Sequence, residues 1–227
     1  MDFSFTDEQI EMKKEAIKFA KKELNHDIYK YDHEHKFSKE GWKKCAEFEV
    51  QGLTFPEKYG GNKCDVLTAM LIMEGLGYGC RDNGLIFSIN AQMWSVQTPI
   101  LQFGTEEQKQ KYLPGLINGE LIGAHGMSEP NSGSDAYSMV TTAKYDQEKQ
   151  IYVLNGSKIF VTNGPVADIF VVFATTDKAK GFMGITGFIL EKGMDGLTVG
   201  AYTQKMGLRT SPMSELYLDN CQVPVSA

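Results

Sequence analysis

Apolar residues recur every three to four positions through the first half of the chain, which is the spacing of one face of an α-helix. Thr6-Asp7-Glu8-Gln9 is a capping box, so we expect the first helix to begin there. Phe5 is placed to form a hydrophobic staple with Ile10 across this helix start. The predicted buried face of the helix follows at helical spacing: Ile10, Ile17, Ala20, Leu24 and Ile28.

Further helices are predicted up to about residue 118. One contains Trp42 and Cys45 and ends near Gly52, and a breaker loop at residues 55–61 follows it. Residues 67–76 after Asp65 read as a strongly apolar helix. Residues 83–103 are apolar nearly all round, which is typical of a helix buried in a bundle. A second capping box at residues 105–108 starts a short helix, and we expect Pro114 to lie beyond its end.

After about residue 118 the pattern changes to short β-rich runs separated by turn residues. Asn155-Gly156 between two such runs, residues 151–154 and 157–161, predicts a hairpin with a type I′ turn. Residues 169–174, 185–190, 198–202 and 216–218 are further predicted strands. The predicted fold is therefore α+β: an all-α N-terminal domain, residues 1–117, followed by an antiparallel β-barrel or sandwich domain, residues 118–227.

Composition narrows the possible partners. The chain has 227 residues, 42% of them hydrophobic and 23% charged, and a net charge of −6 without a basic run. This balance argues against nucleic acid or an anionic membrane as a partner. No apolar run could span a bilayer, and the N-terminus does not resemble a secretory signal. The four cysteines form no Cys-x-x-Cys pair, so we expect reduced thiols, a cytoplasmic protein and no metal site.

Residues 123–135 form the most unusual stretch of the chain. They read Gly-Ala-His-Gly-Met-Ser-Glu-Pro-Asn-Ser-Gly-Ser-Asp, with neither a helical nor a strand period. Pro130, Asn131 and Gly133 are turn residues, so the backbone is expected to bend and to leave N–H groups free for a ligand. An ordinary surface loop fits this composition equally well.

A second stretch points to one family. Residues 158–164 read Lys-Ile-Phe-Val-Thr-Asn-Gly. The two stretches together resemble the acyl-CoA dehydrogenase family, whose pattern runs roughly Thr-Glu-Pro-x-x-Gly-Ser-Asp and then Lys-x-Trp/Phe-Ile-Thr-Asn. Residues 205–209 and 215–224 are similar to the end of the family's middle domain. The resemblance covers essentially the whole chain, stops before the family's third domain, and agrees with the predicted order of a helical and a β domain.

The resemblance implies FAD as the cofactor and assigns its contacts. A reducible flavin needs hydrogen-bond donors near its pyrimidine ring and N5 atom, and an apolar wall that excludes water. By resemblance, His125, Met127 and Ser128 hold the flavin ring, Phe160 covers it and Thr162 bonds near N5. Ser128 stands where the family commonly has threonine, and Phe160 where it often has tryptophan. We expect the Ser128 and Thr162 hydroxyls to face one cleft.

Each of these residues also has an ordinary structural explanation. His125 fits a partly buried strand histidine, Phe160 a core residue and Thr162 a sheet residue. The resemblance favours the functional role for Ser128 and Thr162. It leaves both readings open for His125, which is not the aromatic residue usual at that position in the family.

The resemblance also implies a thioester substrate. Ser134 and Asp135 match positions near the thioester and the pantetheine phosphate, although Ser and Asx turns explain them equally well. Residues 83–98 would line the acyl pocket, where Met93 and Trp94 are bulky enough to shorten it.

No catalytic residue is assigned within the chain. The family's base is a glutamate of its third domain, which we expect beyond Ala227. Glu129 belongs to the Glu-Pro turn of the motif and is not expected to act as the base.

The implied reaction is α,β-dehydrogenation of an acyl-CoA thioester to the trans-2-enoyl thioester, in fatty acid metabolism, with electrons passed to an electron-transfer flavoprotein. One alternative is a dehydrogenase or oxidase of acyl or aminoacyl groups bound to a carrier protein. Another is a non-catalytic or half-enzyme subunit that needs a separate helical chain. A homo-oligomer is expected for the full-length protein.

Overall fold

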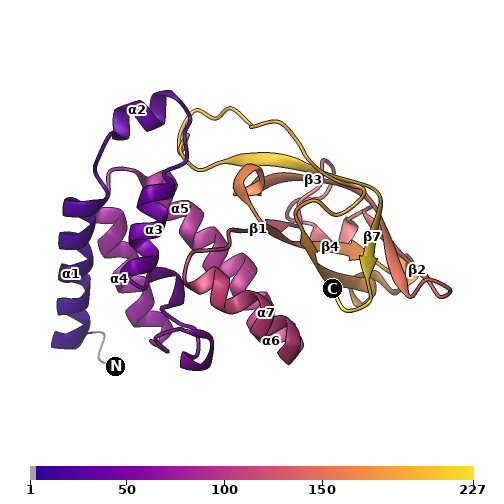
Figure 1. Ribbon diagram of the computed structural model, residues 1–227, viewed down its shortest axis with the longest axis horizontal. Coiled ribbons are helices and arrows are strands. Elements are labelled where there is room, and N and C mark those ends of the chain that lie inside the picture. Colours follow the sequence, from indigo (N-terminus) through magenta and orange to yellow (C-terminus); the bar gives the residue numbers. More distant parts are fainter. Residues whose placement is uncertain (1–3) are drawn as a thin grey trace.

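The structure is a computed structural model that describes residues 4–227. Figure 1 shows the helices gathered at one end of the molecule and the strands at the other. The predicted order of a helical region followed by a β region is therefore confirmed. The helical region contains α1 (Asp7–Glu23), α2 (Ile28–His33), α3 (Lys39–Glu47), α4 (Val66–Gly79), α5 (Asn83–Gln92), α6 (Thr98–Phe103) and α7 (Glu106–Ile117).

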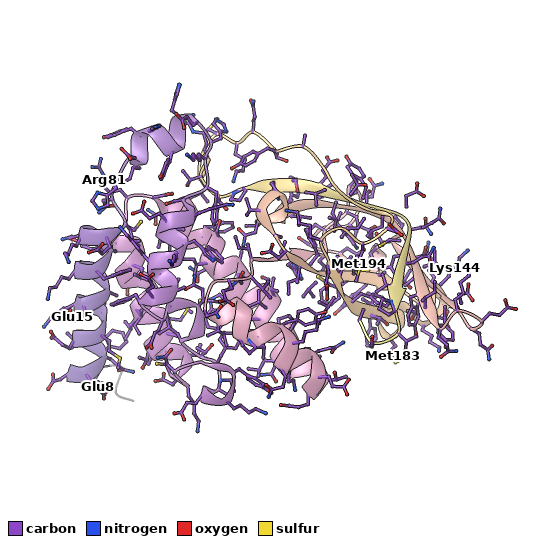
Figure 2. The ribbon with its side chains drawn as sticks, in the orientation of Figure 1. Glu8, Glu15, Arg81, Lys144, Met183 and Met194 are labelled. Atoms are coloured by element: carbon purple, nitrogen blue, oxygen red, sulfur yellow. The ribbon has the colours of Figure 1, made fainter. Side chains whose placement is uncertain are left out.

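Helix α1 begins at the predicted capping box. The Thr6 side chain accepts a hydrogen bond from the Gln9 N–H, and the Gln9 side chain accepts one from the Thr6 N–H. The helix buries Ala16 and Ala20 against α4, whereas Ile10 is exposed and Ile28 belongs to α2. Glu8 and Glu15 project from the outer side of α1 (Figure 2). The predicted face is therefore right from Ala20 to Leu24, which are both buried, and wrong at its two ends. Ile28 falls outside α1 because the helix stops after Glu23.

Residues 83–103 are helical as predicted, apart from a π-helical turn, but the segment is not buried all round, because Phe87 and Phe103 are exposed. The turn spans Met93–Gln97 and joins α5 to α6. It adds a residue to the usual helical repeat, and the Thr98 hydroxyl donates to the Met93 carbonyl at 2.9 Å.

The expectation that Pro114 lies beyond its helix is wrong, because Pro114 lies inside α7. Proline removes one helical hydrogen bond, yet α7 continues to Ile117. Its inner face, which includes Leu113 and Leu116, is fully buried, so tertiary packing outweighs the local loss.

The β region is one curled sheet of seven strands in the order β1-β4-β2-β3-β7-β6, with β5 also paired to β4. Strand β4 pairs in parallel with β1 and, over a short contact, with β2. The other strand pairs are antiparallel. The sheet is therefore mixed, not wholly antiparallel as predicted. The strands are β1 (Gly123–Gly126), β2 (Thr142–Asp146), β3 (Ile151–Thr162), β4 (Ile169–Thr175), β5 (Ile185–Glu191), β6 (Leu197–Val199) and β7 (Met213–Pro224).

The parallel pair arises where the chain crosses from the helices. The Asp168 N–H donates to the Ile122 carbonyl at 2.7 Å, and the Asp168 carboxylate accepts from the Ile122 N–H at 2.8 Å. These bonds fix the residues that precede β1 and β4 side by side, so both strands leave the helical region in the same direction.

The predicted Asn155-Gly156 hairpin is also wrong, because β3 runs through both residues. The chain turns earlier, between β2 and β3, where the Asp146 carboxylate accepts from the Glu148 and Lys149 N–H groups at 3.1 Å each. Asn155-Gly156 instead marks a bulge in the ladder with β7. A Cβ on Gly156 would lie 2.4 Å from the Thr141 hydroxyl, so the close approach of Thr141 explains the glycine.

Strand β4 separates two hydrophobic cores. Ile169 and Val171 pack with the helices, whereas Phe170 and Val172 pack inside the curled sheet. This alternation follows from the two-residue period of a strand. The boundary predicted between residues 117 and 118 stays a prediction, because the helical core includes side chains of β4.

Candidate functional site

The predicted cofactor residues come from two segments that lie side by side: the loop after β1 and the end of β3. The Ile159 N–H donates to the Ser128 carbonyl at 2.8 Å and joins them directly. Ser128 and Thr162 are both half-buried, so neither hydroxyl is lost in the core of the sheet. Met127 is half-buried on the same loop. That the two hydroxyls face one cleft stays a prediction.

A buried ion pair fastens the loop to the strand. Lys158 Nζ lies 2.7 Å from Glu129 Oε1, and the exposed fractions of the two side chains are 0% and 1%. Lys158 also donates to the Met127 carbonyl at 3.2 Å. Glu129 further accepts from the backbone N–H groups of Val140 and Thr141, at 2.6 and 3.0 Å. Both charges are therefore paired and hydrogen-bonded, as burial requires.

The same contacts set the charge states. Burial would raise the pKa of Glu129, but hydrogen bonds from Lys158, Thr141 and Val140 outweigh it and lower the pKa. Burial lowers the pKa of Lys158, and Glu129 opposes part of that shift. The lowered pKa keeps Glu129 ionised beside Lys158. That Glu129 is not the base stays a prediction.

Phe160 is not a core residue. The residue is 67% exposed, although its strand neighbour Val161 is fully buried. It lies at a register shift of the β3–β7 ladder and has a φ of 56°. At this irregular position the Phe160 side chain is exposed, one residue after the Ile159 N–H that bonds to Ser128.

His125 lies in β1, on the strand that leads into the loop. Its ring contacts Phe173 edge-on, with centroids 5.4 Å apart. Burial lowers its pKa, and the charge of Lys158 adds to the shift. A neutral imidazole next to an aromatic ring fits a strand histidine and a flavin neighbour equally.

Ser134 and Asp135 are exposed on the far part of the loop. The loop folds on itself there: Glu129 and Ser132 exchange backbone hydrogen bonds, and the Ser132 hydroxyl donates to the Asp135 carbonyl at 2.8 Å. The Asp135 carboxylate accepts from the Ser138 hydroxyl. These bonds fit the turn explanation for Asp135, but both residues are exposed, so a substrate contact for Ser134 and Asp135 stays a prediction.

The two bulky residues predicted for the acyl pocket differ in their exposure. Met93 is fully buried in the helical core, so it does not border an open pocket. Trp94 is half-buried, and its indole N–H donates to Asn90 Oδ1 at 3.0 Å. Of these two residues, only Trp94 keeps exposed surface that could border a pocket.

Asn163 is a structural residue of the site that the sequence did not single out. Its side-chain amide is buried and donates to the Ser88 carbonyl at 3.0 Å and to the Gly123 carbonyl at 3.2 Å. It thereby ties the end of β3 to α5 and β1. The signal was present, because asparagine closes the second motif.

Ser128, Phe160 and Thr162 all keep exposed surface, and their joint role as a cofactor site stays a prediction. The exposed Phe160 ring offers an apolar face, while Ser128 and Thr162 offer hydroxyls next to a loop that is held rigidly from below. Among residues 4–227, no group of three or more His, Cys, Asp and Glu side chains is placed to hold a metal ion. No helix in the same part of the chain is long and apolar enough to cross a membrane.

Comparison with protein families decides the relationship. Residues 6–120 match the family described as acyl-CoA dehydrogenase, N-terminal domain, and residues 124–221 match its middle domain. The chain belongs to the acyl-CoA dehydrogenase family. A short-chain-specific acyl-CoA dehydrogenase of Clostridium acetobutylicum is 42% identical over 225 residues, which are 99% of this chain and 58% of that protein.

Other members of the family act on carrier proteins. The L-prolyl-[peptidyl-carrier protein] dehydrogenase of a Serratia species is 38% identical and is matched over 58% of its length by all of this chain. The crystal structure of the prolyl acyl carrier protein oxidase AnaB superposes with a TM-score of 0.94 at 47% identity, covering 98% of this chain and 58% of that one. The structure of PigA with FAD and proline gives a TM-score of 0.95 at 38% identity, over 100% and 58% of the two chains. This acyl-CoA dehydrogenase family chain therefore spans a little over half the length of these relatives.

Proposed function

We propose that this chain forms the FAD-binding and thioester-binding part of a flavoenzyme that oxidises the Cα–Cβ bond of an acyl-CoA to the trans-2-enoyl thioester. The observation that carries the proposal is the direct bond between Ile159 and Ser128, which brings the two motif segments together around Phe160 and Thr162. FAD would supply the acceptor for a hydride from the β-carbon. Membership of the family and the FAD complex of PigA support this cofactor.

The residues of the chain divide the work of binding. The Met127–Ser128 backbone and the Ser128 hydroxyl would hold the polar edge of the flavin, and Thr162 would donate near N5. Phe160 would cover one side of the ring and keep water away. His125, neutral because burial lowers its pKa, would lie beside the ring without adding charge. Ser134 would contact the substrate near its thioester, and Asp135 would lie near the pantetheine phosphate.

The proton from the α-carbon needs a base on the side of the substrate opposite the flavin. Glu129 is paired with Lys158, and we do not propose it for this role. We therefore place the base in the part of the relatives' length that this chain does not span. The electron acceptor is proposed to be an electron-transfer flavoprotein, since a structure that matches at 44% identity comes from a study of that protein. The half-enzyme alternative, a cytoplasmic location and a homo-oligomer stay predictions.

A carrier-protein substrate is the second candidate. AnaB and PigA, described as acting on prolyl groups of carrier proteins or bound to proline, resemble this chain at 47% and 38% identity. Trp94, half-buried in the segment predicted to line the acyl pocket, would favour a small acyl group in either case.

FAD binding to the purified 227-residue protein tests the proposal through quenching of flavin fluorescence and the visible absorbance spectrum. Thr162→Val should weaken FAD binding by about fivefold, because one hydrogen bond is lost. Thr198→Val, at an exposed position of β6, is the matched control and should leave affinity unchanged. Absence of FAD binding by the parent protein would overturn the cofactor assignment.

The spectrum of the bound flavin then separates the two substrate classes. Short-chain acyl-CoA should perturb it if the CoA proposal is right, and a prolyl carrier protein should do so under the second candidate. This readout needs no turnover, so it does not depend on the base.

A further inference from the structure

Phe160 has a backbone conformation that bulky residues seldom adopt. Its φ is 56°, in the left-handed region, and it lies within a strand. Most other non-glycine residues with positive φ in residues 4–227 are polar residues of turns and helix ends. For a bulky residue this conformation is a true outlier and costs free energy. Something nearby must therefore hold Phe160 in place.

The alternation of β3 shows why the strain arises. Lys158 and Val161 are both fully buried, although residues three positions apart on a regular strand point to opposite faces. The ladder resolves the conflict with a bulge: Lys158 pairs with Leu216 and Val161 with Ser214, so three steps on β3 match two on β7. The extra residue is absorbed between them, where Phe160 turns left-handed and its ring points out.

Buried polar anchors lie on both sides of the bulge. Before it, Lys158 is held by Glu129 and the Met127 carbonyl. After it, the Asn163 amide is held by the Ser88 and Gly123 carbonyls, and the Asn163 N–H donates to Pro212 at 2.7 Å. If either anchor shifted, the buried Lys158 ammonium or Asn163 amide N–H groups would lose their hydrogen bonds, at a cost comparable to the strain at Phe160.

We propose that Lys158, through its pair with Glu129, and Asn163 are positioning residues that hold Phe160 in this strained conformation before any ligand binds. The exposed ring is then already fixed at the edge of the site, so ligand binding does not bear the entropic cost of ordering it. This inference rests on the proposed flavin site for its purpose. The strain itself can be tested without a ligand.

The first test compares glycine and alanine at position 160 by urea unfolding of the 227-residue protein. Relief of a left-handed conformation is worth about a five- to thirtyfold gain in the folding equilibrium constant. Inside a regular strand, replacing alanine by glycine normally lowers the folding equilibrium constant by about two- to fivefold. The folding equilibrium constant of F160G should therefore exceed that of F160A, by up to about fifteenfold. At Val153, a regular position of the same strand, V153G should be less stable than V153A.

The second test asks whether the anchors impose the strain. In a Glu129→Gln/Lys158→Met background, which replaces the ion pair by neutral groups of similar size, the advantage of glycine over alanine at position 160 should disappear. In Asn163→Gly, whose backbone tolerates the φ of 67° at that position, the advantage should shrink. This second variant keeps the test decisive if the first does not fold. FAD affinity, measured by fluorescence quenching with Phe160 intact, should fall about tenfold in each background.

The possible failures are distinguishable. F160A more stable than F160G in the parent protein would show that Phe160 is unstrained and overturn the proposal. An undiminished glycine advantage in both anchor backgrounds, or unchanged FAD affinity there, would also overturn the positioning role. If the parent protein binds no FAD, the proposed function fails, but the two stability comparisons still decide whether the anchors strain Phe160.

Discussion

His125 illustrates how burial fixes the charge of one residue. Its pKa is lowered by burial and by the charge of Lys158, so the folded protein binds a proton there less tightly than the unfolded chain. Acidification therefore favours unfolding. The free energy of unfolding begins to fall as the pH drops through the histidine pKa of the unfolded chain, about 6.5. It stops falling below the lower pKa of the folded protein.

Replacing His125 by glutamine should remove this contribution to the pH dependence of stability. The free energy of unfolding of the parent protein, measured with urea between about pH 5 and pH 8, should decrease toward acid more steeply than that of H125Q. H26Q, which removes an exposed histidine, is the matched control. Equal slopes for H125Q and the parent would contradict the prediction.

Single residues of the site were readable from the sequence only through the motif. Ser128, Phe160 and Thr162 could be singled out because they stand at positions with a family role. Lys158 opens the second motif, but its pairing with Glu129 could not be predicted, since the two residues lie 29 positions apart in the sequence. The exposed ring of Phe160 was equally hidden, because a bulge breaks the alternation on which strand predictions rest.

At the scale of elements, the contact between α1 and α4 depends on small residues. A Cβ on Gly75 would lie 2.7 Å from the Lys13 carbonyl oxygen, and one on Gly79 would lie 2.6 Å from that of Ile17. Gly77, between them, has only Asn83 Oδ1 nearby, at 3.5 Å. Gly75 and Gly79 therefore allow α1 and α4 to pack closely, whereas Gly77 is not needed for this contact.

Alanine substitutions in α4 should have opposite effects at these positions. Gly79→Ala should lower the free energy of unfolding by about 1–3 kcal/mol, because the backbone of α1 must move away. Gly77→Ala should raise it by about 0.5–1 kcal/mol, since alanine favours the helix and meets no clash. Thermal or urea unfolding of the two variants measures both values. A destabilised G77A, or a stabilised G79A, would show that helix propensity and packing had been assigned wrongly.

Elements were predictable where their signals are local. Both capping boxes start helices as expected, because each is complete within four residues. The prediction at Pro114 was wrong because the buried side chains of α7 keep the helix intact. The prediction at Asn155-Gly156 was wrong because contacts with β7 and Thr141 hold these residues within β3. The parallel placement of β1 also depends on a long-range contact, from Asp168 to Ile122.

At the scale of the whole molecule, the helical and β regions share more than a linker. Ile169 and Val171 of β4 belong to the helical core. The buried Ser88 and Ser211 hydroxyls lie 2.8 Å apart, and Arg209 forms an ion pair with Asp32. The loop before β7 passes over to the helices near α2, as Figure 1 shows.

These shared contacts predict that both regions unfold in one cooperative transition. Cys45 is buried in the helical core and Cys221 in the sheet core, so each thiol reacts only when its own region opens. With pulsed thiol labelling across a urea series, both cysteines should become reactive at the same midpoint. Leu154→Ala, in the sheet core, should destabilise by about 2–5 kcal/mol and move both midpoints together. If L154A shifts only the Cys221 midpoint, the regions are independent folding units, and the boundary predicted between residues 117 and 118 separates two autonomous domains.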